Sequence, residues 1–218
     1  MEQHTSLYRQ FLKGFHFHPT QKQDELLKKL ADFISNTSVY CLFLIKGYAG
    51  TGKTTIVSSV VNHLHPFGYK AVLLAPTGRA AKVMGNYAKK QSLTIHKKIY
   101  YPKHDPNTGM SFVLQQNKHQ NTIFIVDEAS MIPDGNPDAR LFNNRSLLYD
   151  LMKYVYSGRN CKLILVGDTA QLPPVKLDLS PALDKPYLEA TFNMEVRSLE
   201  LDEVMRQHED SGILNNAT

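Results

Sequence analysis

Apolar positions at helical spacing mark the first predicted helix. Leu26, Leu27, Leu30 and Ile34 recur with the period of one helix face. Thr20 precedes them, and Gln23 follows Thr20 by three residues, which is the capping-box pattern of a helix start. The pattern therefore predicts a helix that begins after Thr20.

Short continuous apolar runs alternate with further helical segments along the chain. The runs are too short for helices and are typical of strands buried on both faces. They predict strands at residues 40–45, 71–75, 122–126, 162–166 and 196–201, and helices at residues 53–63, 78–89 and 147–156. This alternation predicts an α/β fold with a mostly parallel sheet covered by helices on both faces.

One segment departs from the alternation. Within residues 100–116, two short β-prone runs flank the sequence Asp105-Pro106-Asn107-Thr108-Gly109, which is rich in turn-forming residues. We therefore expect a small β-hairpin inserted into the α/β domain.

Composition narrows the class of protein. Of the 218 residues, 42% are hydrophobic and 21% charged, close to a globular average, which argues against disorder. The longest apolar run, residues 39–45, is too short to span a bilayer, and the first thirty residues lack a secretory pattern. Cys41 and Cys161 both lie in strand-like runs and are expected to be buried, reduced thiols. We expect a cytoplasmic protein without a membrane segment.

The distribution of charge indicates a polyanionic partner. The net charge is +5, yet the 72 residues from Phe33 to His104 contain ten Lys or Arg and no Asp or Glu. A block of one sign is typical of a surface that binds a polyanion, although chance segregation on a solvated surface stays open. Tyr87, Tyr100 and Tyr101 are interleaved with lysines in this region, a combination that suits single-stranded nucleic acid, although burial of any one of these tyrosines in the core stays open.

A phosphate-binding loop follows the first predicted strand. Gly47-Tyr48-Ala49-Gly50-Thr51-Gly52-Lys53-Thr54 matches G-x-x-x-x-G-K-[ST] and precedes a helix start. Backbone amides at a helix N-terminus bind phosphate, Lys53 would neutralise the β- and γ-phosphates, and the Thr54 hydroxyl would bind Mg²⁺. The expected cofactors are ATP and Mg²⁺.

Polar residues that follow two other strands complete the expected catalytic set. Asp127 and Glu128 come directly after residues 123–126, where Asp127 would hold Mg²⁺ and Glu128 would orient or deprotonate the attacking water. Gln171 lies on the loop after residues 163–166, where a side chain that senses the γ-phosphate belongs. Hydrolysis of ATP is the predicted chemistry.

Six segments in this order resemble the first motor domain of superfamily-1 helicases, and most closely the RecD/Dda branch, to which the exodeoxyribonuclease V alpha subunit is similar. They are GYAGTGKTT at 47–55, APTGRAA at 75–81, TIH at 94–96, IVDEASM at 125–131, GDTAQLPPV at 167–175 and VMRQ at 204–207. The resemblance implies a RecA-like three-layer sandwich of the P-loop NTPase class. It also implies an ATP-dependent 5′-to-3′ DNA helicase.

The resemblance assigns further roles to single residues. Thr55 joins the nucleotide-binding loop, Gln23 resembles the glutamine that reads adenine, and Arg206 resembles an arginine that reaches the γ-phosphate. Two alternative roles stay open: Gln23 could serve only to cap the helix, and Arg206 could serve only to form an ion pair with Glu203. The residues that match segments contacting single-stranded DNA are Pro76, Thr77, Gly78, Arg79, Thr94 and His96, with Lys97 and Lys98 beside them.

The resemblance also predicts the domain organisation. Residues 1–207 would form the first RecA-like domain, and residues 208–218 would begin the connection to a second motor domain, which would bring an arginine finger. The hairpin lies where the family places a strand-separating pin, but an ordinary surface hairpin is an equal alternative. Two other functions stay open: an RNA-dependent ATPase of the same superfamily, and a nucleic-acid-binding module switched by nucleotide.

Overall fold

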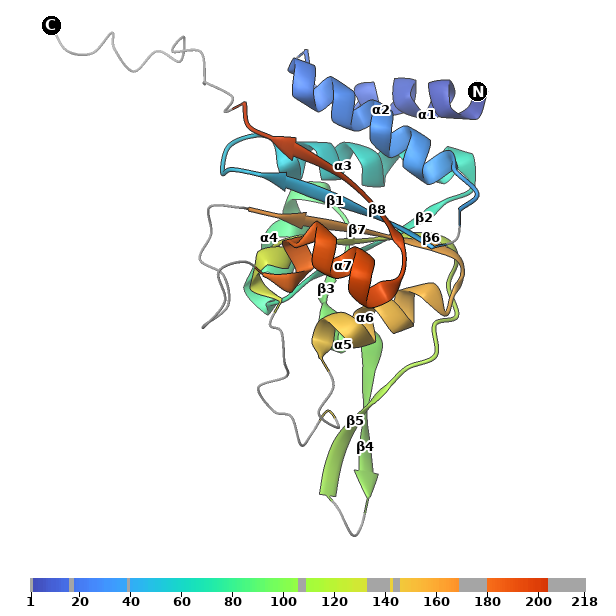
Figure 1. Cartoon of the computed structure of the whole chain (residues 1–218), viewed down its shortest axis with the longest axis vertical. Coiled ribbons are helices and arrows are strands. Elements are labelled where there is room, and N and C mark those ends of the chain that lie inside the picture. The colour runs from blue at the N-terminus through green and yellow to red at the C-terminus, as the bar shows by residue number, and fades with distance from the viewer. Residues whose placement is uncertain are drawn as a thin grey trace, which may run out of the picture.

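A six-stranded parallel sheet forms the centre of the molecule in the computed structural model (Figure 1). The structure describes residues 2–15, 18–38, 40–105, 109–132, 142, 146–168 and 180–203. The strand order is β3-β2-β6-β7-β1-β8. These strands are β1 (Cys41–Gly47), β2 (Lys70–Ala75), β3 (Ser92–Thr94), β6 (Gln120–Val126), β7 (Arg159–Gly167) and β8 (Glu195–Leu201). The predicted α/β fold with a parallel sheet is confirmed.

Helices cover both faces of the sheet, and each face has its own hydrophobic core. On one face, Cys41, Phe43 and Ile45 pack with α1 (Glu2–Leu12), α2 (Gln21–Ser35), α3 (Lys53–His63) and α4 (Gly78–Ala88). On the other face, Leu42 and Leu44 pack with α5 (Ile95–Ile99), α6 (Leu147–Tyr156) and α7 (Lys185–Phe192). Alternate residues of β1 thus enter opposite cores, which explains why the strand is continuously apolar.

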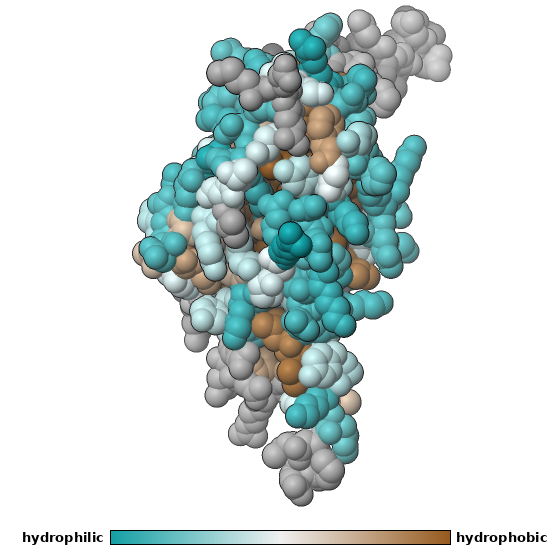
Figure 2. Space-filling model, turned by 90° about the vertical axis from the view of Figure 1, so that its right-hand side faces the viewer, coloured by the Kyte–Doolittle hydropathy of each residue, from teal (hydrophilic) through white to brown (hydrophobic). Residues whose placement is uncertain are grey.

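Three short 3₁₀ turns also lie among the described residues: η1 (His65–Phe67), η2 (Ala129–Met131) and η3 (Pro181–Leu183). Cys41 and Cys161 are buried and unbridged, as expected. The face turned to the viewer in Figure 2 is mostly hydrophilic, which fits a chain whose apolar residues lie in the two cores. Among the described helices, none has the length and apolar character that a bilayer crossing demands.

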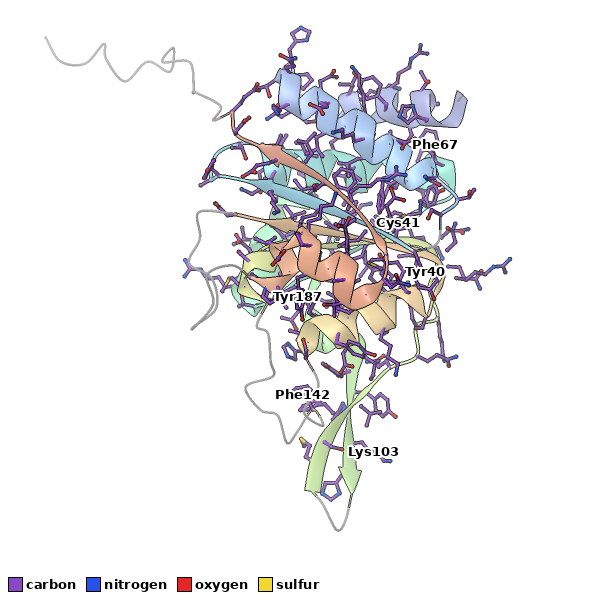
Figure 3. The ribbon with its side chains drawn as sticks, in the orientation of Figure 1. Tyr40, Cys41, Phe67, Lys103, Phe142 and Tyr187 are labelled. Carbon is purple, nitrogen blue, oxygen red and sulfur yellow. The ribbon has the colours of Figure 1, made fainter. Side chains whose placement is uncertain are left out.

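The predicted hairpin is present and projects from the body of the domain (Figure 1). Strands β4 (Tyr100–Asp105) and β5 (Gly109–Leu114) pair antiparallel, with Tyr100 opposite Leu114. Phe142 lies at the base of the hairpin and stacks on Phe112 with ring centroids 4.9 Å apart, whereas Lys103 lies farther along it (Figure 3). The buried hydroxyl of Tyr100 donates a 2.8 Å hydrogen bond to Asp150 on α6. The base of the hairpin is therefore anchored to the α/β body.

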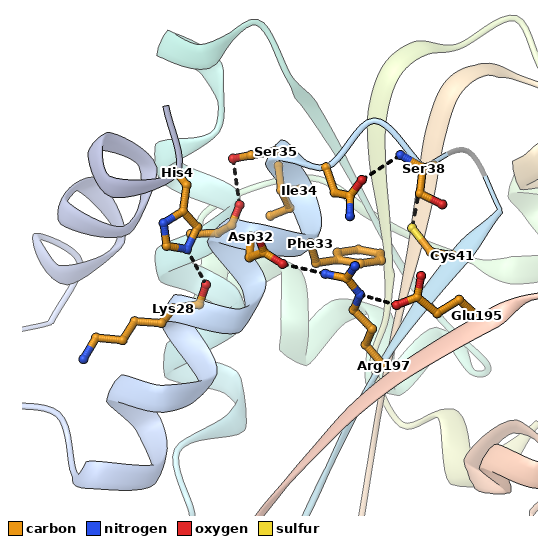
Figure 4. A network of polar contacts seen from close by, with 12 residues as sticks. His4, Lys28, Asp32, Phe33, Ile34, Ser35, Ser38, Cys41, Glu195 and Arg197 are labelled. Carbon is orange, nitrogen blue, oxygen red and sulfur yellow. Dashed lines mark hydrogen bonds and ion pairs between the residues drawn. The ribbon is translucent and has the colours of Figure 1, made fainter. Parts of the chain in front are cut away.

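A polar network joins α2 to the edge strand β8 (Figure 4). Arg197 on β8 donates from Nη1 to Asp32 on α2 and from Nε to Glu195, both at 2.6 Å. Lys162 of β7 is fully buried and donates to the carbonyl oxygens of Phe33 and Asn36 at the end of α2. These bonds fix the orientation of α2, which carries Gln23 toward the phosphate loop.

Candidate functional site

The loop between β1 and α3 adopts a conformation that its glycines make possible. Gly50 and Gly52 have φ values of 80° and 87°, in the left-handed region that favours glycine. A Cβ on Gly47 would lie 2.6 Å from the carbonyl oxygen of Leu201 on β8, closer than real Cβ atoms approach. Gly52 is the N-cap of α3 and makes no side-chain cap bond, so the first-turn amides of α3 are open to an anion.

Lys53 folds back over its own loop. Its Nζ donates to the carbonyl oxygens of Gly47 at 2.6 Å and Tyr48 at 2.8 Å, and lies 3.8 Å from a carboxylate oxygen of Asp168. Burial lowers the pKa of Lys53, and the nearby carboxylates of Asp168, Asp127 and Glu128 act in the opposite direction. The ammonium therefore sits between the loop and the acidic strand ends, where an anionic phosphate would neutralise it.

Asp127 and Glu128 follow β6 at the same edge of the sheet. The backbone N–H of Asp127 donates to Leu74 on β2 at 3.0 Å. Burial, and then the charge of Glu128, raise the pKa of Asp127 to about 6. Glu128 has φ 56° and ψ 36°, a left-handed conformation that is strained for a residue with a side chain. Such strain gathers at functional sites, and Glu128 lines the cavity described next.

These groups surround one cavity of about 490 Å³. Ala49, Gly50, Gly52, Lys53, Thr54, Thr55, Tyr87, Asp127, Glu128, Gly167 and Asp168 line it. Two of these residues, Asp168 and Tyr87, were not among the residues predicted for the nucleotide site. Asp168 follows the parallel strand β7, and carboxyl ends of parallel strands meet at one edge, so its position carried a usable signal.

The lining fits a nucleotide and Mg²⁺. The Thr54 hydroxyl and the Asp127 carboxylate are oxygen ligands of the kind Mg²⁺ prefers, and this ion usually completes its shell with phosphates and water. Among the described residues, no group of three or more His, Cys, Asp and Glu could hold a metal.

Gln23 bonds to α2 and to the phosphate loop at once. Its Oε1 accepts from the backbone N–H of Thr20 at 3.1 Å, which confirms the predicted capping box. Its Nε2 donates to the carbonyl oxygen of Thr51 at 3.0 Å, and the side chain is 1% exposed. Both ends of the amide are therefore engaged within the protein. The predictions for Gln171 and Arg206 fall outside the described residues.

The two segments predicted to contact DNA lie side by side. Strands β2 and β3 pair in parallel with Ala75 opposite Thr94, so residues 76–79 and α5 leave the same edge of the sheet. The hydroxyl of Thr77 accepts from the Ala80 N–H and caps α4, and the hydroxyl of Thr94 accepts from the Lys97 N–H and caps α5. Gly78, Arg79 and Lys97 are exposed, whereas Pro76 and Lys98 are half-buried.

His96 packs against the hairpin base instead of standing free. Its ring lies 5.4 Å from that of Phe142 and 5.9 Å from that of Tyr100, centroid to centroid. Burial lowers the pKa of His96, so the imidazole is predominantly neutral at physiological pH. The side chain thus connects α5 to the hairpin.

Comparisons with known proteins agree with this architecture. A family model described as AAA domain matches residues 19–217. The chain is 29% identical over 161 residues to the ATP-dependent RecD2 DNA helicase of Deinococcus radiodurans, covering 74% of this chain and 20% of that protein. It is 30% identical over 171 residues to the ATP-dependent DNA helicase dda of Enterobacteria phage T4, covering 75% and 34%.

Among solved structures, a Pif1 helicase from Bacteroides in complex with ADP-AlF3 and ssDNA has the same fold, with a TM-score of 0.50 and 18% identity. That match covers 89% of this chain and 44% of the Pif1 chain. The chain spans a fifth to a third of the two curated helicases described above. The match over residues 19–217 shows that the chain belongs to the AAA domain family, and within it the chain resembles the RecD/Dda-like superfamily-1 helicase motor domain.

Proposed function

We propose that this chain is the first motor domain of an ATP-driven DNA helicase. The observation that carries the proposal is the convergence of Lys53, Asp127 and Glu128 on one cavity at the carboxyl edge of a parallel sheet. The candidate DNA contacts, residues 76–79 and 94–98, leave the sheet through the neighbouring strands β2 and β3. Nucleotide and single-stranded DNA would thus occupy adjacent parts of the same edge.

The residues of the cavity have distinct roles in ATP hydrolysis. The first-turn amides of α3 and Lys53 bind the phosphates and neutralise their charge. Glu128 accepts a proton from the water that attacks the γ-phosphorus, while the bond from that phosphorus to the bridging oxygen breaks and ADP leaves. When bound between Thr54 and Asp127, Mg²⁺ would supply further charge neutralisation on the phosphates.

The finer assignments rest on the resemblance to the family. They are 5′-to-3′ polarity, adenine recognition by Gln23, γ-phosphate contacts by Gln171 and Arg206, and a pin function for the hairpin. The limits of the first domain at residues 1–207, and a connection at residues 208–218 to a second motor domain, have the same basis. A second domain would complete the nucleotide cleft.

Steady-state Mg-ATP hydrolysis with and without oligo-dT tests the proposal. We expect slow turnover wherever an arginine finger from a second motor domain is not engaged, because such a finger contributes about 10³ to 10⁵ in rate in related ATPases. Glu128→Gln should abolish residual turnover while nucleotide binding persists. A chain that binds neither ATP nor oligo-dT would refute the proposal.

Two comparisons separate the alternative functions. If the chain is a nucleotide-switched binding module, the wild type should not hydrolyse ATP at all. The Glu128→Gln variant should then bind DNA with the same dependence on nucleotide as the wild type. An RNA-dependent ATPase would respond to oligo-U more strongly than to oligo-dT, because proteins distinguish RNA through its 2′-hydroxyl.

A further inference from the structure

We propose that Tyr87 couples the candidate DNA contact to the phosphate loop through helix α4. The inference rests on the proposed function, because it concerns communication between the proposed nucleotide and DNA sites. It identifies Tyr87 as a positioning residue and not as a group that takes part in the chemistry.

The central observation is a contact between two hydroxyl groups. The phenolic oxygen of Tyr87 and the hydroxyl oxygen of Thr55 are 2.9 Å apart, and either can donate. Thr55 follows Thr54 in the first turn of α3, and both threonines line the nucleotide cavity together with Tyr87. The contact therefore joins α4 to α3 at the end of α3 that would hold phosphate.

Helix α4 can transmit a displacement because it is capped and packed along its length. The Thr77 hydroxyl caps its first turn, beside the exposed candidate DNA contacts Gly78 and Arg79. Met84 and Ala88 are fully buried in the core that α4 shares with α3. A movement of residues 76–79 would therefore shift the eleven-residue helix as a body.

Two further hydrogen bonds between this region and α3 lie at the opposite end of α3. Asn62 donates to the carbonyl oxygen of Ala88 at 3.4 Å, and Lys90 donates to that of Val61 at 2.8 Å. These bonds can act as a hinge near the end of α3. Ala88 directly follows Tyr87, so a rotation of α4 about these bonds would swing the Tyr87 side chain, which reaches from this end of α4 to Thr55 at the phosphate end of α3.

The experiment measures thermodynamic coupling instead of turnover. The Kd of fluorescein-labelled oligo-dT is determined for the full chain with and without a saturating non-hydrolysable ATP analogue, and the ratio of the two values is the coupling factor. Each variant serves as its own reference, so a uniform change in affinity cancels. We expect a wild-type factor of at least about fivefold, and Tyr87→Phe should reduce it by about fivefold, the change that one neutral hydrogen bond supports.

Matched variants distinguish a lost hydroxyl contact from a general disturbance. Thr55→Val removes the partner hydroxyl and should reduce the coupling factor as Tyr87→Phe does, whereas Thr55→Ser keeps the hydroxyl and should retain the factor. Combining Tyr87→Phe with Thr55→Val should give no further loss. Tyr149→Phe, at a 53% exposed tyrosine on α6, should leave the factor unchanged.

The outcomes separate this inference from the function on which it rests. If both ligands bind but the wild-type factor is one, or if Tyr87→Phe keeps the wild-type factor, the coupling role is overturned and the proposed function stands. If the wild type binds neither ligand, the proposed function fails and the inference fails with it.

Discussion

The side-chain amide of Gln23 donates a hydrogen bond to the carbonyl oxygen of Thr51, so the first turn of α2 is bonded directly to the phosphate loop. Gln23→Glu tests this contact. A glutamate can still accept from the Thr20 N–H, but an ionised carboxylate cannot donate to Thr51. We expect a loss of about 1–3 kcal/mol in the free energy of unfolding and weaker nucleotide binding, measured by urea denaturation and calorimetric titration.

Thr20→Ala is the matched control, because it removes only the capping hydroxyl of the same helix turn. It should lower the free energy of unfolding by about 1 kcal/mol and leave nucleotide affinity within about twofold of the wild type. Equal nucleotide affinities in the two variants would mean that the bond to Thr51 does not shape the loop.

Asp127 should make stability depend on pH in a defined window. Its pKa is about 6 in the folded protein against 3.8 for an ordinary Asp, so the folded state holds this proton more tightly than the unfolded state. The contribution is present in full below pH 4 and is lost as the pH rises through 6. The loss amounts to at most about 3 kcal/mol.

Denaturation of the wild type and of Asp127→Asn from pH 4 to 7 should show the stability difference growing in favour of the variant, then levelling off. A difference that stays constant across this range would contradict the burial of an ionisable group here.

Lys97 should contribute to the salt dependence of DNA binding. The side chain is exposed on α5, whereas Lys98 is half-buried and burial lowers its pKa. If Lys97 contacts a phosphate of single-stranded DNA, Lys97→Ala should reduce the slope of log K against log salt by about 0.7. Fluorescence anisotropy with oligo-dT at several salt concentrations measures the slope.

Lys153→Ala, at an exposed lysine on α6, is the control and should leave the slope unaltered. An equal reduction of the slope in Lys153→Ala would indicate a diffuse charge effect and no specific phosphate contact by Lys97.

The buried Lys162 should stabilise the end of α2. It is 1% exposed, and its Nζ donates to the carbonyl oxygens of Phe33 at 2.5 Å and Ile34 at 3.4 Å, and to that of Asn36. A cation at a helix C-terminus also interacts favourably with the helix dipole. Lys162→Met should leave these carbonyls without their donor and lower the free energy of unfolding by about 1–3 kcal/mol.

The surface pair of Lys29 with Glu25 provides the comparison for Lys162. It spans 2.8 Å on the exposed side of the same helix. Exposed pairs of this spacing contribute only about 0.3–0.5 kcal/mol, so Lys29→Met should have a small effect. If both substitutions destabilise the protein equally, the capping role of Lys162 is wrong.

Local signals predicted the elements whose residues decide their own conformation. The Thr20–Gln23 capping box and the apolar run of β1 are both present where the pattern placed them. Helix α7 was missed although Asp184 caps it and Pro186 lies in its first turn, both usable start signals. The three-residue β3 and five-residue α5 are too short for a period to be recognised.

Tertiary packing decided the parts of the site that the sequence could not reveal. The His96 ring packs on Phe142, which is 46 positions away, so its burial depends on how the hairpin sits on the domain. Tyr87 meets Thr55 only because α3 and α4 pack side by side with a particular offset. No spacing rule within one helix could have predicted either contact.

The approach of Gly47 to Leu201 constrains how this loop can evolve. Gly47 is paired with Leu201 in the sheet, and the carbonyl oxygen of Leu201 occupies the space that any larger residue at position 47 would need. Selection for a stable domain alone would therefore retain glycine at position 47, even in a descendant that no longer uses nucleotide. Conservation of that glycine among diverged copies would therefore reflect the close approach of two strands. Conservation or loss of Lys53 would instead show whether nucleotide chemistry was kept.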